Sequence, residues 1–135
     1  MLMPKKVKHR KWRKGTSKGV SHQGTKVTFG SFGLMAMGTK WITGRQLEAS
    51  RRAIIRYMKK GGKLWVRVFP DKPVTKKGQE VPMGGGKGGV DHYVFPIKPG
   101  RIIFELDGLK EDVVKEAFGQ AADKLPIRTK IIARK

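Results

Sequence analysis

Apolar residues recur at a helical period in the stretch WITGRQLEASRRAIIRYMKKGGK, which begins at Trp41. At 100° per residue, Leu47, Ile54 and Met58 fall within about 40° of one another. Ile55 and Tyr57 flank them. A stripe of this kind is typical of a helix that packs one side against a core. We therefore predict an amphipathic helix whose apolar side faces the interior.

Polar residues mark the ends and the other side of this helix. Thr43 and Gln46 have the spacing of a capping box, and Gly61–Gly62 supplies a stop. Basic residues gather on the opposite side, namely Arg45, Arg52, Arg56, Lys59 and Lys60. Such a ridge is often only a solvated surface, but here Glu48 is the single acid available to balance it.

A second amphipathic helix is predicted over Leu109–Leu125. Acidic residues fill its first turn, where the helix dipole favours them, and Pro126 ends it. Its apolar stripe consists of Val114, Phe118, Ala121 and Leu125.

Shorter alternating or apolar runs predict strands around the two helices. These runs are Val27–Met37, Leu64–Phe69, Val90–Phe95, Arg101–Leu106 and Ile127–Ala133. In the second run Leu64, Val66 and Val68 should share one face, and Pro70 and Pro73 should end the strand in a turn. The order of elements favours the α+β class, with a compact mixed or antiparallel sheet packed with two helices.

Two segments show neither kind of pattern. We interpret residues 1–26 as a basic N-terminal arm that orders on its partner, because it has too little apolar surface to fold alone. Residues 27–135 form a single globular domain in this interpretation. Within that domain residues 74–89 should be a long loop rich in Gly and Lys, and a loop of this length is usually functional or disordered.

Charge is distributed unevenly along the 135 residues, whose formal net charge is +21. From residue 1 to residue 47 the chain has 11 basic residues and no acid, whereas 105–123 has six acids and two lysines. A polyanion would relieve the self-repulsion, so nucleic acid is the first candidate partner and an anionic membrane surface the second. The basic end should face that polyanion, and the acidic end should face solvent.

The composition also limits compartment and chemistry. The chain has no cysteine, which excludes disulfides and thiolate chemistry and fits a reducing compartment. No apolar run approaches the roughly 18 residues of a membrane span, and no apolar h-region follows the basic N-terminus. The first helix lacks the aromatic and leucine-rich wedge of a membrane-surface helix. We therefore expect a cytoplasmic protein without membrane association.

The segment MGGGKGG at Met83–Gly89 literally satisfies the dinucleotide fingerprint GxGxxG. That site needs a following helix whose N-terminus binds the pyrophosphate, but the strand-like VDHYVFP follows here. The Walker A pattern also fails, because Lys87 precedes Gly88 and Val81 stands where the first glycine is required. We expect no nucleotide cofactor.

No arrangement of side chains indicates catalysis or a metal site. His9 and His22 lie in the basic arm. Asp91 and His92 are adjacent on a predicted strand, so their side chains should point to opposite faces and fail to pair. Metal binding needs several converging His or carboxylate groups, which the spacing does not supply. The sequence predicts a protein that is not an enzyme.

Nucleic-acid binding has better support, from the arm, the helix ridge and a basic loop. The loop contributes Lys72, Lys76, Lys77 and Lys87. Trp12 lies in the arm, where it can stack on a base. Core packing is favoured for Trp65, and Trp41 fits either role. Composition alone does not separate RNA from DNA.

Several segments together resemble the bacterial-type sixteenth protein of the large ribosomal subunit. The opening MLMPKKVKHRKWRKG and then FGSFGL, ITGRQLEASRRA, KKGGKLWVRVFPDKP, MGGGKGG, KPGRIIFELDG and KLPIRTK follow in family order. The resemblance covers essentially the whole chain, from Met1 to about Lys130, and KGGKLWVRVFPDKP is its most specific part.

This resemblance implies a compact α+β domain that is a non-enzymatic constituent of the large ribosomal subunit. Members bind large-subunit rRNA near the central protuberance, join late in assembly and help position tRNA at the A site and the P site. The implied partners are large-subunit rRNA, tRNA and neighbouring large-subunit proteins, without homo-oligomers or cofactors. The implied location is the ribosome in the cytoplasm, and an organelle-encoded equivalent is also compatible.

The resemblance carries over onto two sets of residues. The implied rRNA contacts are Lys5, Lys6, Lys8, His9, Arg10, Lys11, Trp12, Arg13, Lys14 and Lys18 in the arm and Arg45, Arg51, Arg52, Arg56 and Lys59 in the helix. The loop implied to face tRNA and the peptidyl-transferase region comprises Met83, Gly84, Gly85, Gly86, Lys87 and Gly88. The family loop commonly reads Arg-Met-Gly-Lys-Gly-Lys-Gly, so Pro82 and Gly85 here replace two charges.

Two other classes stay open on sequence alone. A free-standing, non-specific RNA- or nucleoid-binding protein explains the charge as well, and would not co-sediment stably with large subunits. A nucleotide-dependent enzyme built on the glycine loop would bind nucleotide in a titration.

Overall fold

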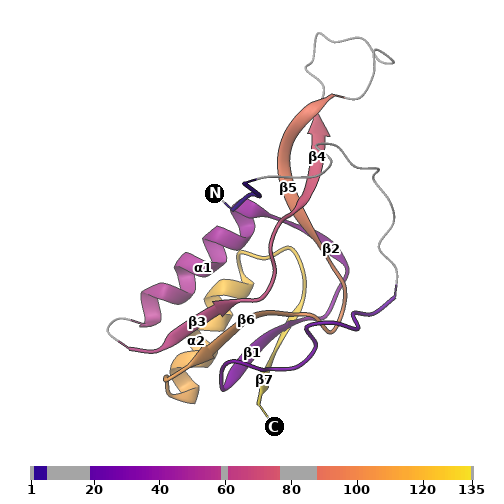
Figure 1. Ribbon diagram of the computed structural model, residues 1–135. Helices are drawn as coiled ribbons and strands as arrows, with labels where there is room; N and C mark the ends of the chain where they lie inside the picture. Colours follow the sequence, from indigo (N-terminus) through magenta and orange to yellow (C-terminus); the bar gives the residue numbers. More distant parts are fainter. Residues whose placement is uncertain (1, 6–18, 59–60, 77–87, 135) are drawn as a thin grey trace.

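The computed structural model describes residues 2–5, 19–58, 61–76 and 88–134. Its elements follow the chain as β1 (Phe32–Ala36), β2 (Lys40–Thr43), α1 (Gly44–Met58), β3 (Lys63–Val66), β4 (Lys72–Lys76), β5 (Gly89–Ile97), β6 (Ile102–Asp107), α2 (Glu111–Ala122) and β7 (Thr129–Ala133). Helices and sheets in this order confirm the α+β class (Figure 1).

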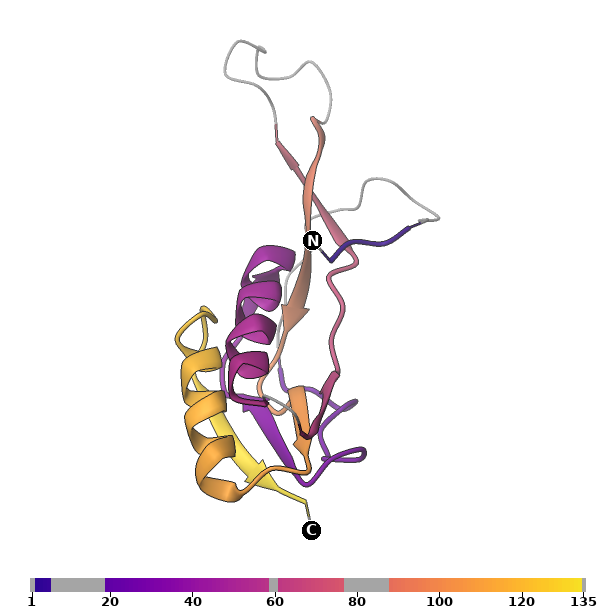
Figure 2. The ribbon, with the colours of Figure 1, turned by 90° about the vertical axis from the view of Figure 1, so that its left-hand side faces the viewer.

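The described strands form two sheets rather than the one sheet expected, and they pair in antiparallel fashion. A four-stranded sheet has the order β3–β6–β1–β7, and a three-stranded sheet has the order β2–β5–β4. Strands β4 and β5 rise away from the four-stranded sheet as a twisted ribbon (Figures 1 and 2). The two helices pack on each other and on one face of the four-stranded sheet, as Figure 2 shows.

The predicted stripe of α2 is confirmed, because Val114, Phe118, Ala121 and Leu125 all belong to the buried cluster. The stripe predicted for α1 is only partly right. Leu47 and Ile54 are fully buried, and Tyr57 and Met58 pack against the cluster from its edge.

Ile55 of α1 is 43% exposed, so its predicted place at the core is wrong. The small residues Ser50 and Ala53 are buried in its place. The helix therefore rests on the flank that carries these two residues, and their size lets the neighbouring backbone approach closely.

The strand predicted over Leu64–Phe69 is shorter than expected. It ends as β3 at Val66, which is 36% exposed, whereas Val68 is buried beyond the strand. β3 is one of the two outer strands of its sheet and, among the described strands, pairs only with β6. Pro73 does not end a turn but lies inside β4, an outer strand, where a missing N–H is tolerated.

The loop predicted over 74–89 is shorter at both ends. Val74–Lys76 belong to β4, and Gly89 begins β5. Positions 77–87 of that prediction lie outside the described residues.

Residues 19–31 form a strap that crosses the face of the four-stranded sheet away from the helices (Figures 1 and 2). Ser21 donates its N–H to the Pro99 carbonyl at 2.9 Å, and the Ile102 N–H donates to the Gly24 carbonyl at 2.7 Å. The last part of the predicted arm is therefore fastened to the domain. Arm residues 6–18 lie outside the described residues.

Candidate nucleic-acid interface

The start of α1 is fixed by the capping box that the sequence predicts. The Thr43 N–H donates to Gln46 Oε1 at 3.0 Å, and the Gln46 N–H donates to Thr43 Oγ1 at 3.1 Å. These two bonds fix the first turn of the helix, and the apolar side of the helix faces the core. Arg45, Arg52 and Arg56 are exposed on the other side, as the helical period predicts.

Glu48 divides the arginines of α1 into two groups. Its carboxylate pairs with Arg51, whose Nε donates to Oε2 at 3.1 Å, and it lies 3.4 Å from Arg52 Nε. The hydrogen bond from Arg51 is the main reason that the pKa of Glu48 is lowered. Arg45 and Arg56 form no ion pair with any described residue.

Arg51 therefore differs from the other implied rRNA contacts on the helix. Its side chain is 35% exposed and is already bound to a carboxylate, whereas that of Arg52 is 71% exposed. We define the α1 ridge as Arg45, Arg52 and Arg56, and Arg51 lies beside it.

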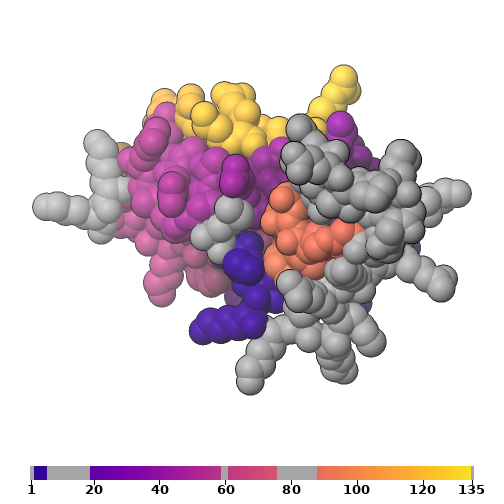
Figure 3. All heavy atoms as spheres, turned by 90° about the horizontal axis from the view of Figure 1, so that it is seen from above, coloured from indigo at the N-terminus to yellow at the C-terminus, as the bar shows by residue number. Residues whose placement is uncertain are grey.

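Residues 2–5 lie next to α1 and the β4–β5 ribbon in the view of Figure 3. Leu2 packs against the buried cluster, and Lys5 is exposed. The other implied contacts of the arm (Lys6, Lys8, His9, Arg10, Lys11, Trp12, Arg13, Lys14 and Lys18), together with Lys59 and the loop residues Met83, Gly84, Gly85, Gly86 and Lys87, lie outside the described residues. Gly88 immediately precedes β5.

Lys72 is not the loop lysine that the sequence suggested. It belongs to β4 and is only 9% exposed, and its Nζ lies 4.6 Å from the centre of the Trp41 ring. This cation–π contact gives the half-buried Trp41 a partner within the protein.

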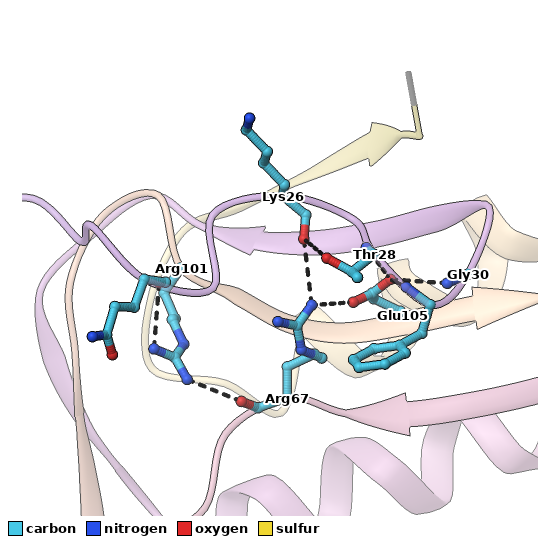
Figure 4. Close-up of polar contacts among 8 residues, drawn as sticks. Lys26, Thr28, Gly30, Arg67, Arg101 and Glu105 are labelled. Atoms are coloured by element: carbon cyan, nitrogen blue, oxygen red, sulfur yellow. Dashed lines mark hydrogen bonds and ion pairs between the residues drawn. The ribbon is translucent and has the colours of Figure 1, made fainter.

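Glu105 holds the strap against the sheet, and the sequence analysis missed it (Figure 4). Its side chain is fully buried, and Oε1 accepts N–H bonds from Thr28, Phe29 and Gly30 at 2.8–2.9 Å. Oε2 pairs with Arg67 Nη1. The available signal was a single acid inside the apolar run RIIFEL of the predicted strand.

The partners of Glu105 decide its charge. Burial alone would raise its pKa, but the Gly30 amide, the Arg67 guanidinium and the Phe29 amide outweigh that effect, and the pKa is lowered. The carboxylate is therefore ionised at neutral pH, which strengthens its bonds to the strap.

The strap closes tightly at Gly30. A Cβ there would lie 2.6 Å from the Leu106 carbonyl oxygen, and that backbone atom cannot move aside. Only glycine fits at this crossing. The neighbouring Ser31 N–H donates to the same carbonyl at 2.9 Å.

Trp65 lies under the strap, where it is half-buried, rather than in the apolar cluster that was expected to hold it. Its ring stacks on Phe29 with centroids 6.0 Å apart, and the Arg67 guanidinium lies 5.0 Å from the Phe29 centroid. The reason is that Trp65 pairs with Glu105 across the strands and so shares its outward face.

The prediction that Asp91 and His92 cannot pair is wrong. His92 Nδ1 lies 2.7 Å from Asp91 Oδ2. The register of β4 and β5 shifts at this point, since Val74 pairs with His92 and Thr75 with Val90. Asp91 lies at this irregularity of the register, and its carboxylate meets the His92 ring at the surface.

Within the described ranges, no group of three or more His, Cys, Asp or Glu could hold a metal ion. No described helix is both long and apolar enough to cross a membrane.

Comparison with known proteins gives these features a context. The model of the family described as ribosomal protein L16p/L10e matches residues 4–132, nearly the whole chain. The chain belongs to the ribosomal protein L16p/L10e family. Among L16p/L10e relatives, the large ribosomal subunit protein uL16 from each of two Porphyromonas gingivalis strains is 54% identical over 134 residues. These alignments cover 99% of this chain and 93% of each relative.

Membership of the L16p/L10e family makes this chain a structural protein of the large ribosomal subunit and so part of the ribosome. Binding of rRNA within a ribonucleoprotein is a general property of that family. The resemblance seen in the sequence is thereby confirmed.

Proposed function

We propose that this chain binds large-subunit rRNA through its basic arm and the α1 ridge, and helps organise the A-site and P-site tRNA region near the peptidyl-transferase centre. It joins the subunit late in assembly. The observation that carries the rRNA contact is the ridge itself, where Arg45 and Arg56 are exposed and have no ion-pair partner among the described residues.

The physical role needs no catalytic group. RNA helices that pack closely bring phosphates together, and guanidinium and ammonium groups neutralise that repulsion. The exposed ridge offers these groups on a rigid helix, whose position the capping box and the core determine. The described start of the chain, residues 2–5, lies beside α1, and the residues that follow it in the sequence are strongly basic.

The glycine-rich loop is proposed to approach tRNA. Glycines let backbone N–H groups come close to RNA where a Cβ would clash. Since Pro82 and Gly85 stand at positions where relatives commonly carry charge, Lys87 is the only charged residue between Met83 and Gly89.

Sedimentation of the full-length protein with large subunits, at low and high salt, tests this proposal. We expect the protein to remain with the subunits, and Arg56→Glu to dissociate at lower salt than wild type. Lys124→Glu changes the charge equally at an exposed position beyond α2, and should behave as wild type.

A protein that binds RNA but never co-sediments with subunits would support the free-standing RNA-binding alternative. Equal behaviour of Arg56→Glu and Lys124→Glu would contradict a role for the ridge.

A further inference from the structure

A second basic feature lies on a different side of the molecule from the α1 ridge. A cavity of about 320 Å³ opens between the strap and the end of β5. Strap residues 20–23 line it together with Phe95 and Pro96, and Lys98 and Arg101 complete its wall. In Figure 1 α1 lies on the left and the strap enters on the right. Nothing in the α1 interface involves this cavity.

Arg101 is the unusual residue of the wall. Its Nη1 donates to the Gln23 carbonyl at 3.3 Å and its Nη2 to the Arg67 carbonyl at 3.1 Å (Figure 4). Its Cζ lies 5.3 Å from the centre of the Phe95 ring. Its Nε is buried and has no hydrogen-bond partner among the described residues. These partners are all neutral, so they fix the guanidinium without cancelling its charge.

No carboxylate in the described part of the chain compensates this charge. None of the residues that line the cavity is acidic, and no described carboxylate forms an ion pair with Arg101. The nearby Arg67 is already paired with Glu105. Burial first, and then the like charge of Arg67, lower the pKa of Arg101. A partly buried cation without a counter-ion is costly, and a bound anion would remove that cost.

The other lining residues suit a phosphate attached to an organic group. Lys98 and His22 bring further nitrogen donors to the wall, while Phe95, Pro96 and Val20 offer apolar surface. The volume is at the lower end of the range for ligand pockets, which accommodates a phosphate and its sugar. Sugar–phosphate units of this kind form the backbone of RNA.

We propose that this cavity binds a backbone phosphate of the rRNA, so that RNA contacts the protein at the strap as well as at α1. The inference rests on the proposed rRNA-binding function. It assigns Lys98 and Arg101 as phosphate contacts outside the arm, the ridge and the loop.

Directed hydroxyl-radical cleavage tests this placement in assembled subunits. The chain has no cysteine, so a single introduced cysteine can carry an iron chelate at a chosen site. Val20→Cys places the probe at the cavity, because Val20 is 56% exposed there. Arg56→Cys reports on the α1 ridge, and Lys124→Cys on the end of α2.

We expect rRNA cleavage near Val20→Cys as well as near Arg56→Cys. Cleavage from Arg56→Cys without cleavage from Val20→Cys would overturn the inference and leave the proposed rRNA contact of the α1 ridge standing. No cleavage from either probe, in particles that contain the protein, would contradict the proposed function itself.

A charge variant tests the contact chemically. Lys98→Glu should weaken binding to large-subunit rRNA and flatten the log–log salt dependence by about one unit per lost phosphate contact. Lys124→Glu, with the same change of charge, should leave the slope unchanged. Circular dichroism confirms that both variants fold. Equal slopes for the two variants would overturn the assignment.

Inorganic phosphate separates the two possible sources of the anion. In one outcome, a phosphate titration of the wild-type protein shifts the amide resonances of residues 20–23 until they saturate, and Lys98→Glu keeps the wild-type salt dependence of rRNA binding. The cavity then holds a free anion, and the rRNA assignment is overturned. If Lys98→Glu loses both the phosphate-induced shifts and the wild-type salt dependence of rRNA binding, the assignment of the cavity to an rRNA phosphate is supported.

Discussion

At the scale of single residues, Glu105 determines how the strap joins the sheet. A buried carboxylate is tolerated only when its oxygens are satisfied, and here three strap amides and Arg67 satisfy them. The strap continues directly from the arm. One carboxylate in β6 therefore fixes the part of the strap that leads into β1.

Glu105→Gln should lower the free energy of unfolding by about 2–4 kcal/mol, because Arg67 loses its counter-charge and the strap amides lose an ionic acceptor. Urea denaturation at pH 7 measures the change. Glu116→Gln is the matched control, since Glu116 is exposed on α2. Equal stability of the two variants would show that Glu105 does not hold the strap.

The same residue predicts a dependence on pH. Its pKa in the folded protein lies below the ordinary value of 4.5, so its contribution is present above pH 4.5 and is lost as the pH falls through the folded pKa. Wild type should therefore lose stability on acidification below pH 4.5 more steeply than Glu105→Gln. Parallel acid profiles for the two proteins would contradict this.

At the scale of elements, the two sides of α1 have different roles. Leu47 and Ile54 hold it on the core, and the capping box fixes its first turn. The ridge on the other side is left exposed. Glu48 limits that surface, because it occupies Arg51 and lies near Arg52.

Glu48→Gln should strengthen binding to large-subunit rRNA and steepen the salt dependence by up to about one log–log unit, because Arg51 and Arg52 become available to phosphate. The cost to the helix should be below about 0.5 kcal/mol, as for other exposed pairs. Filter binding over a range of salt measures the effect. Glu111→Gln breaks the pair with Lys115 on α2 and should not change binding. An equal response of both variants would contradict the prediction.

The sequence predicted well those features that depend on residues close together in the chain. The period of α2 and the capping box of α1 are local signals, and both are confirmed. Strands β2 and β4 were missed because each is short and is a strand only through its pairing with β5.

The candidate site follows the same rule. Exposure of Arg45, Arg52 and Arg56 follows from helical geometry and could be predicted. The roles of Glu105 and Arg101 could not, because their partners are distant in the chain. Glu105 binds amides 75–77 residues away, and Arg101 binds a carbonyl 78 residues away.

At the scale of the whole molecule, the described basic features lie on more than one side of the domain. The α1 ridge and the cavity lie on different sides, and the chain begins beside α1. The net charge of +21 is thus available to RNA from several directions. Basic groups on more than one side of a protein can neutralise phosphates of more than one RNA segment.

Charge reversal in the arm, Arg10→Glu with Arg13→Glu, should weaken rRNA binding and flatten its salt dependence by about one log–log unit per lost phosphate contact. Titrations at several salt concentrations give the slope. An unchanged slope would count against phosphate contacts by the arm.

Lys87→Ala should lower tRNA affinity or the rate of translation more than it lowers subunit assembly, because Lys87 is the only charged residue between Met83 and Gly89. Purified particles give both quantities, with Lys124→Ala as the control. Failed assembly together with normal tRNA binding in the surviving particles would refute this role.

The outer strands of the two sheets have a consequence for the protein before it meets RNA. β2, β3, β4 and β7 are the strands at the sheet edges. Exposed lysines lie on three of them, at Lys40 in β2, Lys63 in β3 and Lys130 in β7, and β4 carries Pro73. Short strands with lysine or proline resist pairing with the edge of another molecule. Newly made chains are thus protected from aggregating into edge-to-edge stacks during the interval before assembly.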